Sequence, residues 1–253
     1  MSDTPLYRDD PTGRFSSRAD AYARFRPDYA AAAIDAILDG FSAPVVADVG
    51  AGTGISSRQL AHRGAFVYAV EPNEEMRGMI ALHPRIEPVA AQAESLPFED
   101  GAIDLVTAFQ AFHWFDPDRF LREARRVLRP GGRIALAWNE RHDERDEYTA
   151  AWRVLVRAAS GNHPAEARID TARAFLDTTL FSNVRALSFP HVQRMDWEGV
   201  VGRLRSMSYV PPAGEAWDAL IAAMRALHDR WADPRGTVTL ALETRVYLGE
   251  KDV

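Results

Sequence analysis

The sequence predicts an α/β fold with a doubly wound, mostly parallel sheet, and three observations support this prediction. Short apolar runs alternate with helical patterns over the first two-thirds of the 253 residues, as in successive βαβ units. A glycine-rich turn at residues 50–54 directly follows the first apolar run. With 47% hydrophobic residues the chain can bury one sizeable core, so we expect one domain over residues 1–253.

Seven strands are predicted, because apolar runs of this length are typical of buried strands when turn residues bound them. Five of them precede residue 140, namely Val45–Val49, Phe66–Val70, Ile86–Ala90, Ile103–Phe109 and Arg133–Trp138. A sixth strand is expected at Val184–Val192 and a last one at Thr237–Leu248.

Helices are predicted between the strands from apolar spacing and from residues that begin or end helices. The segment from Ile34 to Phe41 repeats apolar residues at i, i+3, i+4 and i+7. Asn73 is a preferred N-cap, and the helix after it is expected to bury a face made of Met76, Met79 and Ile80. The pair Asp116-Pro117 begins a helix that Pro130-Gly131-Gly132 is expected to end.

Helical insertions are expected near the C-terminus, at Tyr148–Ala159, Ile169–Leu180, Asp196–Met207 and Trp217–Trp231. We expect residues 140–235 to form a lid or substrate wall around the sixth strand, with plain packing helices as the alternative. Residues 236–253 are expected to form the last strand.

The turn Gly50-Ala51-Gly52-Thr53-Gly54 is the most informative stretch, because glycines let a backbone lie directly against a ligand. In a doubly wound sheet this first turn lies at the carboxyl edge of the strands, where ligands bind. A dinucleotide fingerprint needs glycine where Ile55 stands, so the spacing disfavours a nicotinamide oxidoreductase. Asp48 adds a carboxylate that suits an ammonium or sulfonium group better than a pyrophosphate.

An acidic residue follows the second strand at the distance that is typical of ribose binding. Glu71 comes 21 positions after Gly50, about where an acid accepts hydrogen bonds from a ribose diol. Nicotinamide enzymes share this feature, so it indicates an adenosine-containing ligand without distinguishing the two cofactors. A solvent-exposed glutamate before a helix is the structural alternative.

Four motifs in order resemble those of class I S-adenosylmethionine-dependent methyltransferases, in the group of the ubiquinone/menaquinone-biosynthesis and trans-aconitate enzymes. They are Asp48–Gly54, Val70–Met76, Ala93–Phe98 with Phe109–Phe115, and Glu123–Gly132. The resemblance implies a seven-stranded sheet whose last strand is antiparallel to its neighbour. It also implies S-adenosyl-L-methionine as cofactor, S-adenosyl-L-homocysteine as product and a small molecule as methyl acceptor. We then expect residues 41–139 to form the cofactor-binding core and residues 1–40 to form a segment that covers the cofactor.

The resemblance further implies roles for single residues. Cofactor contacts are expected from Asp48, Gly50, Ala51, Gly52, Glu71, Pro72, Met76, Ala93, Glu94 and Gln110. Asp48 is expected near the methionine end and Glu71 on the ribose hydroxyls, while Met76 either flanks the adenine or only packs in the core. Many relatives carry Asp where Gln92 stands, which leaves Glu94 to compensate in base recognition.

An N-terminal pattern of Phe15, Tyr22, Arg26, Pro27 and Tyr29 resembles a segment that can fold over the cofactor in these relatives. Arg26 is then a partner for the methionine carboxylate, since arginine suits bidentate carboxylate binding. Tyr22 is expected beside the acceptor. A helix entry with a surface arginine is the alternative.

Methyl transfer from a sulfonium needs positioning and exclusion of water, but no triad, metal or covalent nucleophile. His113, just past the fourth strand, is the candidate general base for a hydroxyl or protonated amine, since its usual pKa of about 6.5 suits that task. A hydrogen-bonded wall residue is the equally open alternative. Trp114 and Tyr209 are expected to contact the acceptor, and the histidines have no metal-ligand spacing.

Composition limits the remaining choices. A net charge of −6 disfavours nucleic acid as a partner, and the absence of cysteine excludes disulfides and thiolate sites. The sequence lacks a signal peptide and any apolar run of about 18 residues, so we expect a cytoplasmic protein without membrane contact. A monomer and a homodimer both stay open. The functional alternative is a protein of methyltransferase fold that binds the cofactor without transferring its methyl group.

Overall fold

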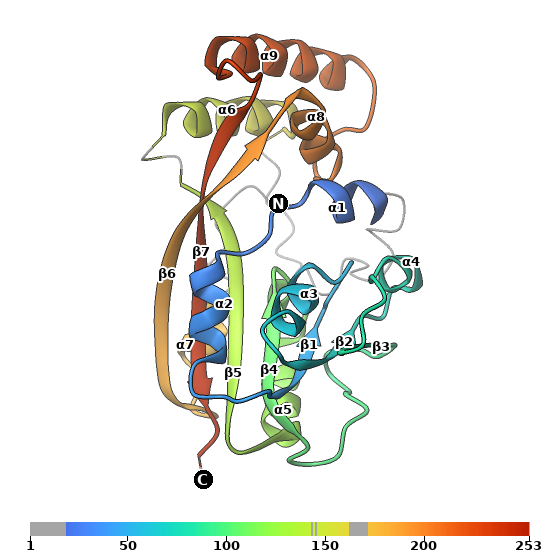
Figure 1. Ribbon diagram of the computed structural model, residues 1–253, viewed down its shortest axis with the longest axis vertical. Helices are drawn as coiled ribbons and strands as arrows, with labels where there is room; N and C mark the ends of the chain where they lie inside the picture. Colours follow the sequence, from blue (N-terminus) through green and yellow to red (C-terminus); the bar gives the residue numbers. More distant parts are fainter. Residues whose placement is uncertain (1–18, 143, 145, 162–171, 253) are drawn as a thin grey trace.

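The computed structural model describes residues 19–142, 144, 146–161 and 172–252, which contain a seven-stranded sheet of order β3-β2-β1-β4-β5-β7-β6 (Figure 1). In chain order the strands are β1 (Val45–Val49), β2 (Phe66–Val70), β3 (Ile86–Val89), β4 (Ile103–Phe109), β5 (Leu128–Arg141), β6 (Ser182–Met195) and β7 (Val238–Glu250). Strands β1 to β5 are parallel, and β7 lies antiparallel to both β5 and β6. The expected mostly parallel sheet with an antiparallel last strand is therefore confirmed.

Helices connect the strands at the expected places. They are α1 (Ala19–Phe25), α2 (Ala31–Leu38), α3 (Ile55–Ala61), α4 (Glu74–Gly78), α5 (Pro117–Val127), α6 (Glu147–Ala159), α7 (Arg173–Leu176), α8 (Trp197–Arg205) and α9 (Glu215–Trp231), with a 3-10 turn at Phe112–Trp114. The predicted N-cap Asn73 is confirmed, since its side chain accepts from the Met76 N–H at 2.8 Å. The helix predicted to begin at Asp116-Pro117 does begin there, and the Asp116 side chain caps it by accepting from the Arg119 N–H at 3.1 Å.

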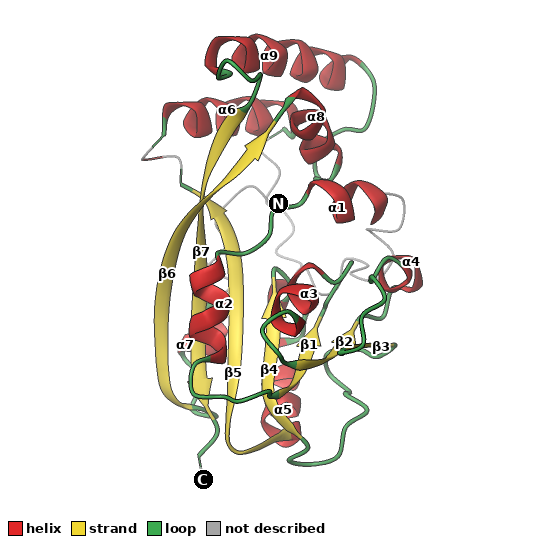
Figure 2. Cartoon of the chain, in the orientation of Figure 1, coloured by secondary structure: helices red, strands yellow, loops and turns green. Residues whose placement is uncertain are grey.

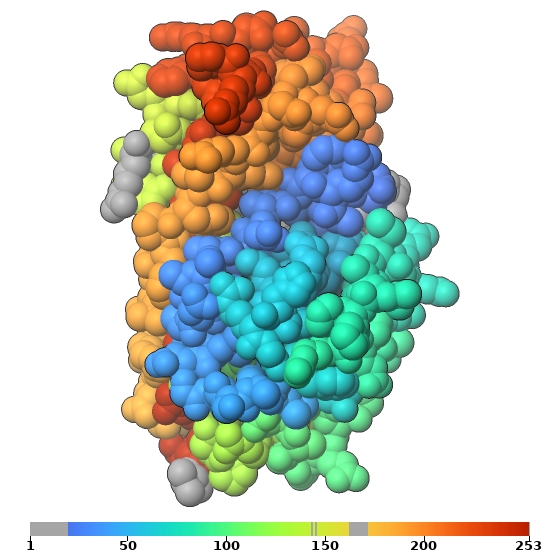
Figure 3. Space-filling model, viewed as in Figure 1, coloured from blue at the N-terminus to red at the C-terminus, as the bar shows by residue number. Residues whose placement is uncertain are grey.

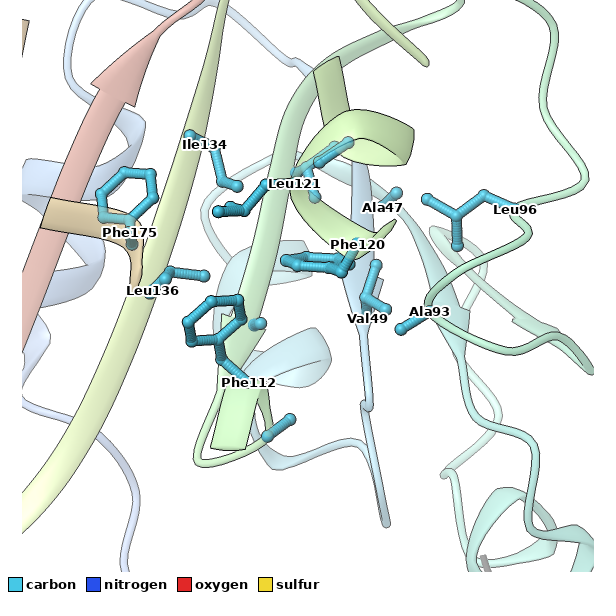
Figure 4. Close-up of a cluster of buried hydrophobic side chains, with 14 of the residues drawn as sticks. Ala47, Val49, Ala93, Leu96, Phe112, Phe120, Leu121, Ile134, Leu136 and Phe175 are labelled. Carbon is cyan, nitrogen blue, oxygen red and sulfur yellow. The ribbon is translucent and has the colours of Figure 1, made fainter. Parts of the chain in front are cut away.

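Both faces of the sheet are covered, because successive strand residues point to opposite sides. Ile134 and Leu136 of β5 pack with α5 and α7, and Figure 4 shows them facing Leu121 and Phe175. Their neighbours Ala135 and Ala137 belong to the cluster that includes α2 and α3 on the other face. Burial of each large apolar side chain contributes about 1.5–3 kcal/mol, so these two layers hold the strand ends in fixed positions.

Strands β6 and β7 extend past the other strands and carry a third group of helices, α6, α8 and α9, which we call the cap (Figure 2). Trp152 of α6, Leu204 of α8 and Met224 of α9 are buried together with Leu240 of β7. Helix α1 packs on α8 so closely that a Cβ on Gly202 would lie 2.3 Å from the Phe25 ring. In the space-filling view the blue α1 segment accordingly lies between the orange α8 segment and the cyan α3 segment (Figure 3). Among the described helices, none combines the length and apolar character needed to cross a membrane.

Some predicted element bounds are wrong. The helix that begins at Pro117 ends at Val127, and residues 130–132 lie inside β5, which begins five residues before the predicted Arg133. The reason is long-range pairing, because the Gly131 N–H donates to the Lys251 carbonyl at 2.9 Å and the Lys251 N–H donates to the Gly132 carbonyl at 2.8 Å.

Two other helix predictions are also corrected. Helix α4 ends at Gly78, so Met79 lies beyond it with 38% of its surface exposed instead of on a buried face. Within the predicted helix Ile169–Leu180 the structure has only the four residues of α7, while residues 169–171 lie outside the described part.

Candidate functional site

A cavity of about 450 Å³ opens at the carboxyl ends of β1 to β4, where the doubly wound topology predicts a ligand site. Its walls come mainly from the turns that follow these four strands, from α1 and from the segment between α1 and α2. Eleven of the predicted site residues line it, namely Tyr22, Gly50, Ala51, Gly52, Glu71, Pro72, Met76, Ala93, Glu94, Gln110 and Trp114. The fold thus brings together residues that lie up to 92 positions apart in the sequence.

The glycine turn borders the cavity and also packs closely against neighbouring loops. Gly50 has φ of +69°, its N–H donates to the Val70 carbonyl at 2.9 Å, and a Cβ added to it would lie 2.6 Å from the Ala111 Cβ. Gly52 has φ of +58°, and its added Cβ would lie 3.3 Å from the Met76 Cε. Glycine is therefore required at residue 50 both for the backbone angle and for the close approach of the Ala111 loop.

Glu71 connects the glycine turn to the end of β2. Its Oε2 accepts from the Gly52 N–H at 2.9 Å, and its Oε1 accepts from the Asn73 N–H at 2.9 Å. Burial raises the pKa of this carboxyl, while the two backbone N–H groups oppose that rise by stabilising the charged form. Each carboxylate oxygen keeps a second lone pair, so the side chain can accept further hydrogen bonds from a ligand in the cavity.

Asp48 does not line the cavity, and the expectation that its carboxylate faces the ligand is wrong. The side chain has 0% exposure and accepts hydrogen bonds from the hydroxyls of Ser56, Ser57 and Thr107 at 2.7, 2.6 and 2.8 Å. Burial raises the pKa of Asp48, and the three hydroxyls oppose the rise. The carboxylate therefore links the first turn of α3 to β1 and β4. These hydrogen bonds hold the glycine turn, which joins β1 to α3, in place.

Gln110 and Glu94 line the cavity, and a hydrogen bond to a neighbouring segment holds each side chain in place. Gln110 has φ of +53°, which is unusual for a residue other than glycine, and its Oε1 accepts from the Asn139 N–H at 2.7 Å. Glu94 accepts from the Asp116 N–H at 2.8 Å. A strained backbone like that of Gln110 is typical of functional sites, where the surrounding contacts hold the residue in place.

The N-terminal segment reaches the cavity through its tyrosines and not through Arg26. Tyr22 and Tyr29 line the cavity, but Arg26 is absent from its walls. The Arg26 Nη2 instead donates to the Ser206 carbonyl at 2.9 Å, and its guanidinium lies 4.7 Å from the centre of the Tyr22 ring. Phe15, which belongs to the same sequence pattern, lies outside the described residues.

His113 does not lie where a general base for the acceptor would have to lie. It is not among the cavity walls, and the Trp138 Nε1 donates to its Nδ1 at 3.4 Å. Burial lowers the pKa of His113 from 6.5 to about 4, so its imidazole is neutral at pH 7 and is a weak base. Of the two expected roles neither lies at the cavity surface, because His113 is held behind it by the hydrogen bond from Trp138, while the adjacent Trp114 does line the cavity.

Tyr209 is partly buried against the cap and does not line the cavity, contrary to the expectation. Tyr29 and Phe115 of the cavity wall were missed as site residues, although Tyr29 belongs to the N-terminal pattern.

Comparisons with known proteins agree with this geometry. Residues 47–136 match the family model described as a methyltransferase domain. An uncharacterized methyltransferase of Mycobacterium bovis is 45% identical over 139 residues, which are 54% of this chain and 56% of that protein. The matched region thus spans just over half the length of that relative.

Two further proteins match over more of the chain. The ubiquinone/menaquinone biosynthesis C-methyltransferase of Acidiphilium cryptum is 32% identical over 189 residues, covering 68% of this chain and 76% of that protein. Among solved structures, a type II methyltransferase from Anaeromyxobacter dehalogenans superposes with a TM-score of 0.70 at 25% identity, over 90% of this chain and 98% of that one.

Proposed function

The chain belongs to the class I S-adenosylmethionine-dependent methyltransferases, and we propose that it transfers the methyl group to a small-molecule acceptor by in-line displacement. The observation that carries the proposal is the position of Glu71. Its carboxylate lines the same cavity as the glycine turn and is held at that turn by the Gly52 N–H at 2.9 Å. This is the arrangement that a ribose diol above a glycine-rich turn requires.

The residues around the cavity fit the cofactor. The volume of about 450 Å³ lies in the range of about 300–1,000 Å³ that small-molecule sites occupy. Gly52 leaves the backbone open toward the ligand, Glu71 has lone pairs for the ribose hydroxyls, and Met76 and Ala93 offer apolar surface for the adenine. Pro72 and Glu94 complete the adenosine side, and Gln110 is assigned to the methionine side.

When bound, the cofactor supplies a methyl group that is already activated by a sulfonium. The chain then has to orient the acceptor and exclude water, which accounts for a site without a strong general base. We assign Tyr22 and Trp114 to the acceptor side of the cavity. We further propose that residues 140–235 select the acceptor, although none of their described members lines this cavity, because α8 packs on α1, the helix that carries Tyr22. The neutral His113 accepts a hydrogen bond from Trp138 and packs beside the ring of Trp114, which lines the cavity.

Binding of S-adenosyl-L-homocysteine, measured by isothermal titration calorimetry, tests the cofactor assignment. We expect Glu71→Gln to weaken this binding by about 5- to 150-fold, the equivalent of roughly 1–3 kcal/mol for ribose hydroxyls that lose a charged acceptor. Glu75→Gln is the matched control, because Glu75 is exposed on α4 and lies outside the cavity walls. Binding of NAD in place of either sulfur compound would contradict the assignment.

Transfer of a radiolabelled methyl group from S-adenosyl-L-methionine to a broad panel of metabolites tests the reaction. We expect at least one acceptor to be labelled by the wild-type protein and by Glu75→Gln. Tight cofactor binding without labelling of any acceptor would favour the alternative of a cofactor-binding protein without methyl transfer.

A further inference from the structure

The loop of residues 90–102, between β3 and β4, carries Ala93 and Glu94 to the cavity wall. Pairing of the strand type within these described residues is limited to one isolated bridge. Such a loop needs other hydrogen-bond partners, because buried backbone N–H and C=O groups are nearly always paired. Helix α5 supplies them through side chains of the fourth sequence motif, Glu123–Gly132, which is not part of the cavity wall.

Two side chains of α5 hold the backbone of Leu96 on both sides. The Leu96 N–H donates to the Glu123 Oε1 at 2.7 Å, and the Leu96 carbonyl accepts from the Arg126 Nη2 at 3.1 Å. The Arg126 Nη1 also donates to the Phe98 carbonyl at 2.9 Å and to the Asp100 carboxylate at 2.7 Å. One glutamate and one arginine of α5 thus bind the loop at three alternate residues.

Glu123 and Arg126 also hold each other in one geometry. The Arg126 Nε donates to the Glu123 Oε2 at 2.9 Å and the Arg126 Nη2 to the Glu123 Oε1 at 2.8 Å, which is a bidentate pair. The hydrogen bond from Arg126 lowers the pKa of Glu123, so the carboxylate is ionised at pH 7. Since 34% of the Arg126 side chain is exposed, the pair itself adds little to stability, and its main effect is on the position of the loop.

The cavity residue Glu94 lies between two points at which α5 holds the loop. Its Oε1 accepts from the N–H of Asp116, the N-cap of α5, at 2.8 Å. On its other side only two residues, roughly 7 Å of chain, separate it from Leu96. Leu96 and Ala93 are buried in the same core cluster, and Figure 4 shows both on this loop. A shift of the Leu96 backbone therefore moves Glu94 as well.

We propose that Glu123 and Arg126 are positioning residues for the cofactor. By holding the backbone of Leu96 they place the Glu94 carboxylate to accept a hydrogen bond from the amino group of adenine, and so set the preference of the site for adenine over hypoxanthine. This role rests on the proposed function and deepens it, since it states how the cofactor site selects its nucleobase.

A carboxylate at this position suits an amino group and not a carbonyl. Beside the hydrogen bond from Asp116, Glu94 has further lone pairs that can accept from a donor in the cavity. Hypoxanthine has a carbonyl oxygen where adenine has the amino group, so it offers no donor there. A site built to hydrogen-bond one group rejects an analogue without it, because a buried polar atom is then left unpaired.

Isothermal titration calorimetry with S-adenosyl-L-homocysteine and S-inosyl-L-homocysteine measures this preference. The two compounds differ in the nucleobase alone, so the ratio of their dissociation constants reports base recognition and is insensitive to a general loss of folded protein. We expect the wild type to bind the adenosyl compound about ten- to a hundredfold more tightly than the inosyl compound.

Two substitutions of Glu123 separate its hydrogen bond to Leu96 from its ion pair. Glu123→Met removes the acceptor of the Leu96 N–H and should lower the ratio by about tenfold, through weaker binding of the adenosyl compound. Glu123→Gln ends the ion pair but keeps an acceptor oxygen for that N–H, so its ratio should stay within about threefold of the wild type.

Two variants of arginines on α5 complete the test. Arg126→Lys keeps the positive charge, but an ammonium lacks the planar fork that reaches both carbonyls of the loop, so the ratio should fall. This variant keeps the test decisive if Glu123→Met does not fold. Arg122→Met removes an exposed arginine outside the cavity walls and should leave the ratio unchanged.

An unchanged ratio in Glu123→Met, or in Arg126→Lys where only that variant folds, would overturn the proposal, because the pair then supports the fold alone. A fall of the ratio in Arg122→Met, or the same fall in Glu123→Gln as in Glu123→Met, would overturn it as well. A wild type that binds both compounds equally tightly would also overturn it, while the cofactor assignment stands. A wild type that binds neither compound would instead refute the proposed function.

Discussion

Substitution of Gly50 by alanine tests how tightly the glycine turn is fixed between β1 and the loop after β4. The substitution introduces two separate costs. Alanine at φ of +69° costs about 1–2 kcal/mol of backbone strain. Its Cβ, 2.6 Å from the Ala111 Cβ, adds an overpacking cost of about 1–3 kcal/mol. We therefore expect Gly50→Ala to lower the free energy of unfolding by about 2–5 kcal/mol, or the melting temperature by about 4–20 °C.

Gly40→Ala is the matched control, because Gly40 has φ of +83° and nothing lies within 4 Å of its added Cβ. This variant should show the strain alone, a loss of about 1–2 kcal/mol. The double variant Gly50→Ala with Ala111→Gly removes the Cβ–Cβ overlap, so its loss should be smaller than the sum of the two single losses by about 1–2 kcal/mol.

Urea denaturation of the wild type, the three single variants and the double variant, followed by circular dichroism, measures these differences. The same samples, titrated with S-adenosyl-L-homocysteine, show whether the Gly50 variants that fold have lost affinity in proportion to their loss of stability. Equal losses for Gly40→Ala and Gly50→Ala, or strictly additive losses in the double variant, would refute the close-approach argument.

Two further predictions concern the buried polar groups. Asp48→Ala removes the acceptor of three hydroxyls and should lower the free energy of unfolding by about 3–5 kcal/mol, whereas Asp48→Asn keeps an acceptor oxygen and should cost clearly less. Equal losses in urea denaturation would count against this network. Burial lowers the pKa of His113 from 6.5 to about 4, so the unfolded chain binds this proton more tightly than the folded one. Stability from this residue should be complete above pH 6.5 and decline by about 3 kcal/mol as pH falls through 4. His113→Phe should flatten that part of the pH–stability curve, and parallel curves for the two proteins would contradict the assignment.

The strands of the parallel part could be predicted from local sequence, and those with tertiary partners far along the chain could not. Val45–Val49, Phe66–Val70 and Ile103–Phe109 were predicted with the bounds that the structure shows, because short apolar runs between turn residues define a strand buried on both faces. The start of β5 was misplaced because it depends on backbone pairing with Lys251, about 120 residues later. Nothing near Pro130 in the sequence reveals that partner.

The same distinction applies to the site. A glycine turn and an acid after the next strand are local motifs whose backbone positions follow from the topology, so Gly50 and Glu71 were placed correctly at the cavity. Side-chain direction depends on partners from other elements. Asp48 was expected to face the ligand, but the hydroxyls of Ser56, Ser57 and Thr107 hold it inside the core. His113 likewise accepts a hydrogen bond from Trp138 of β5, and sequence spacing alone does not predict this contact.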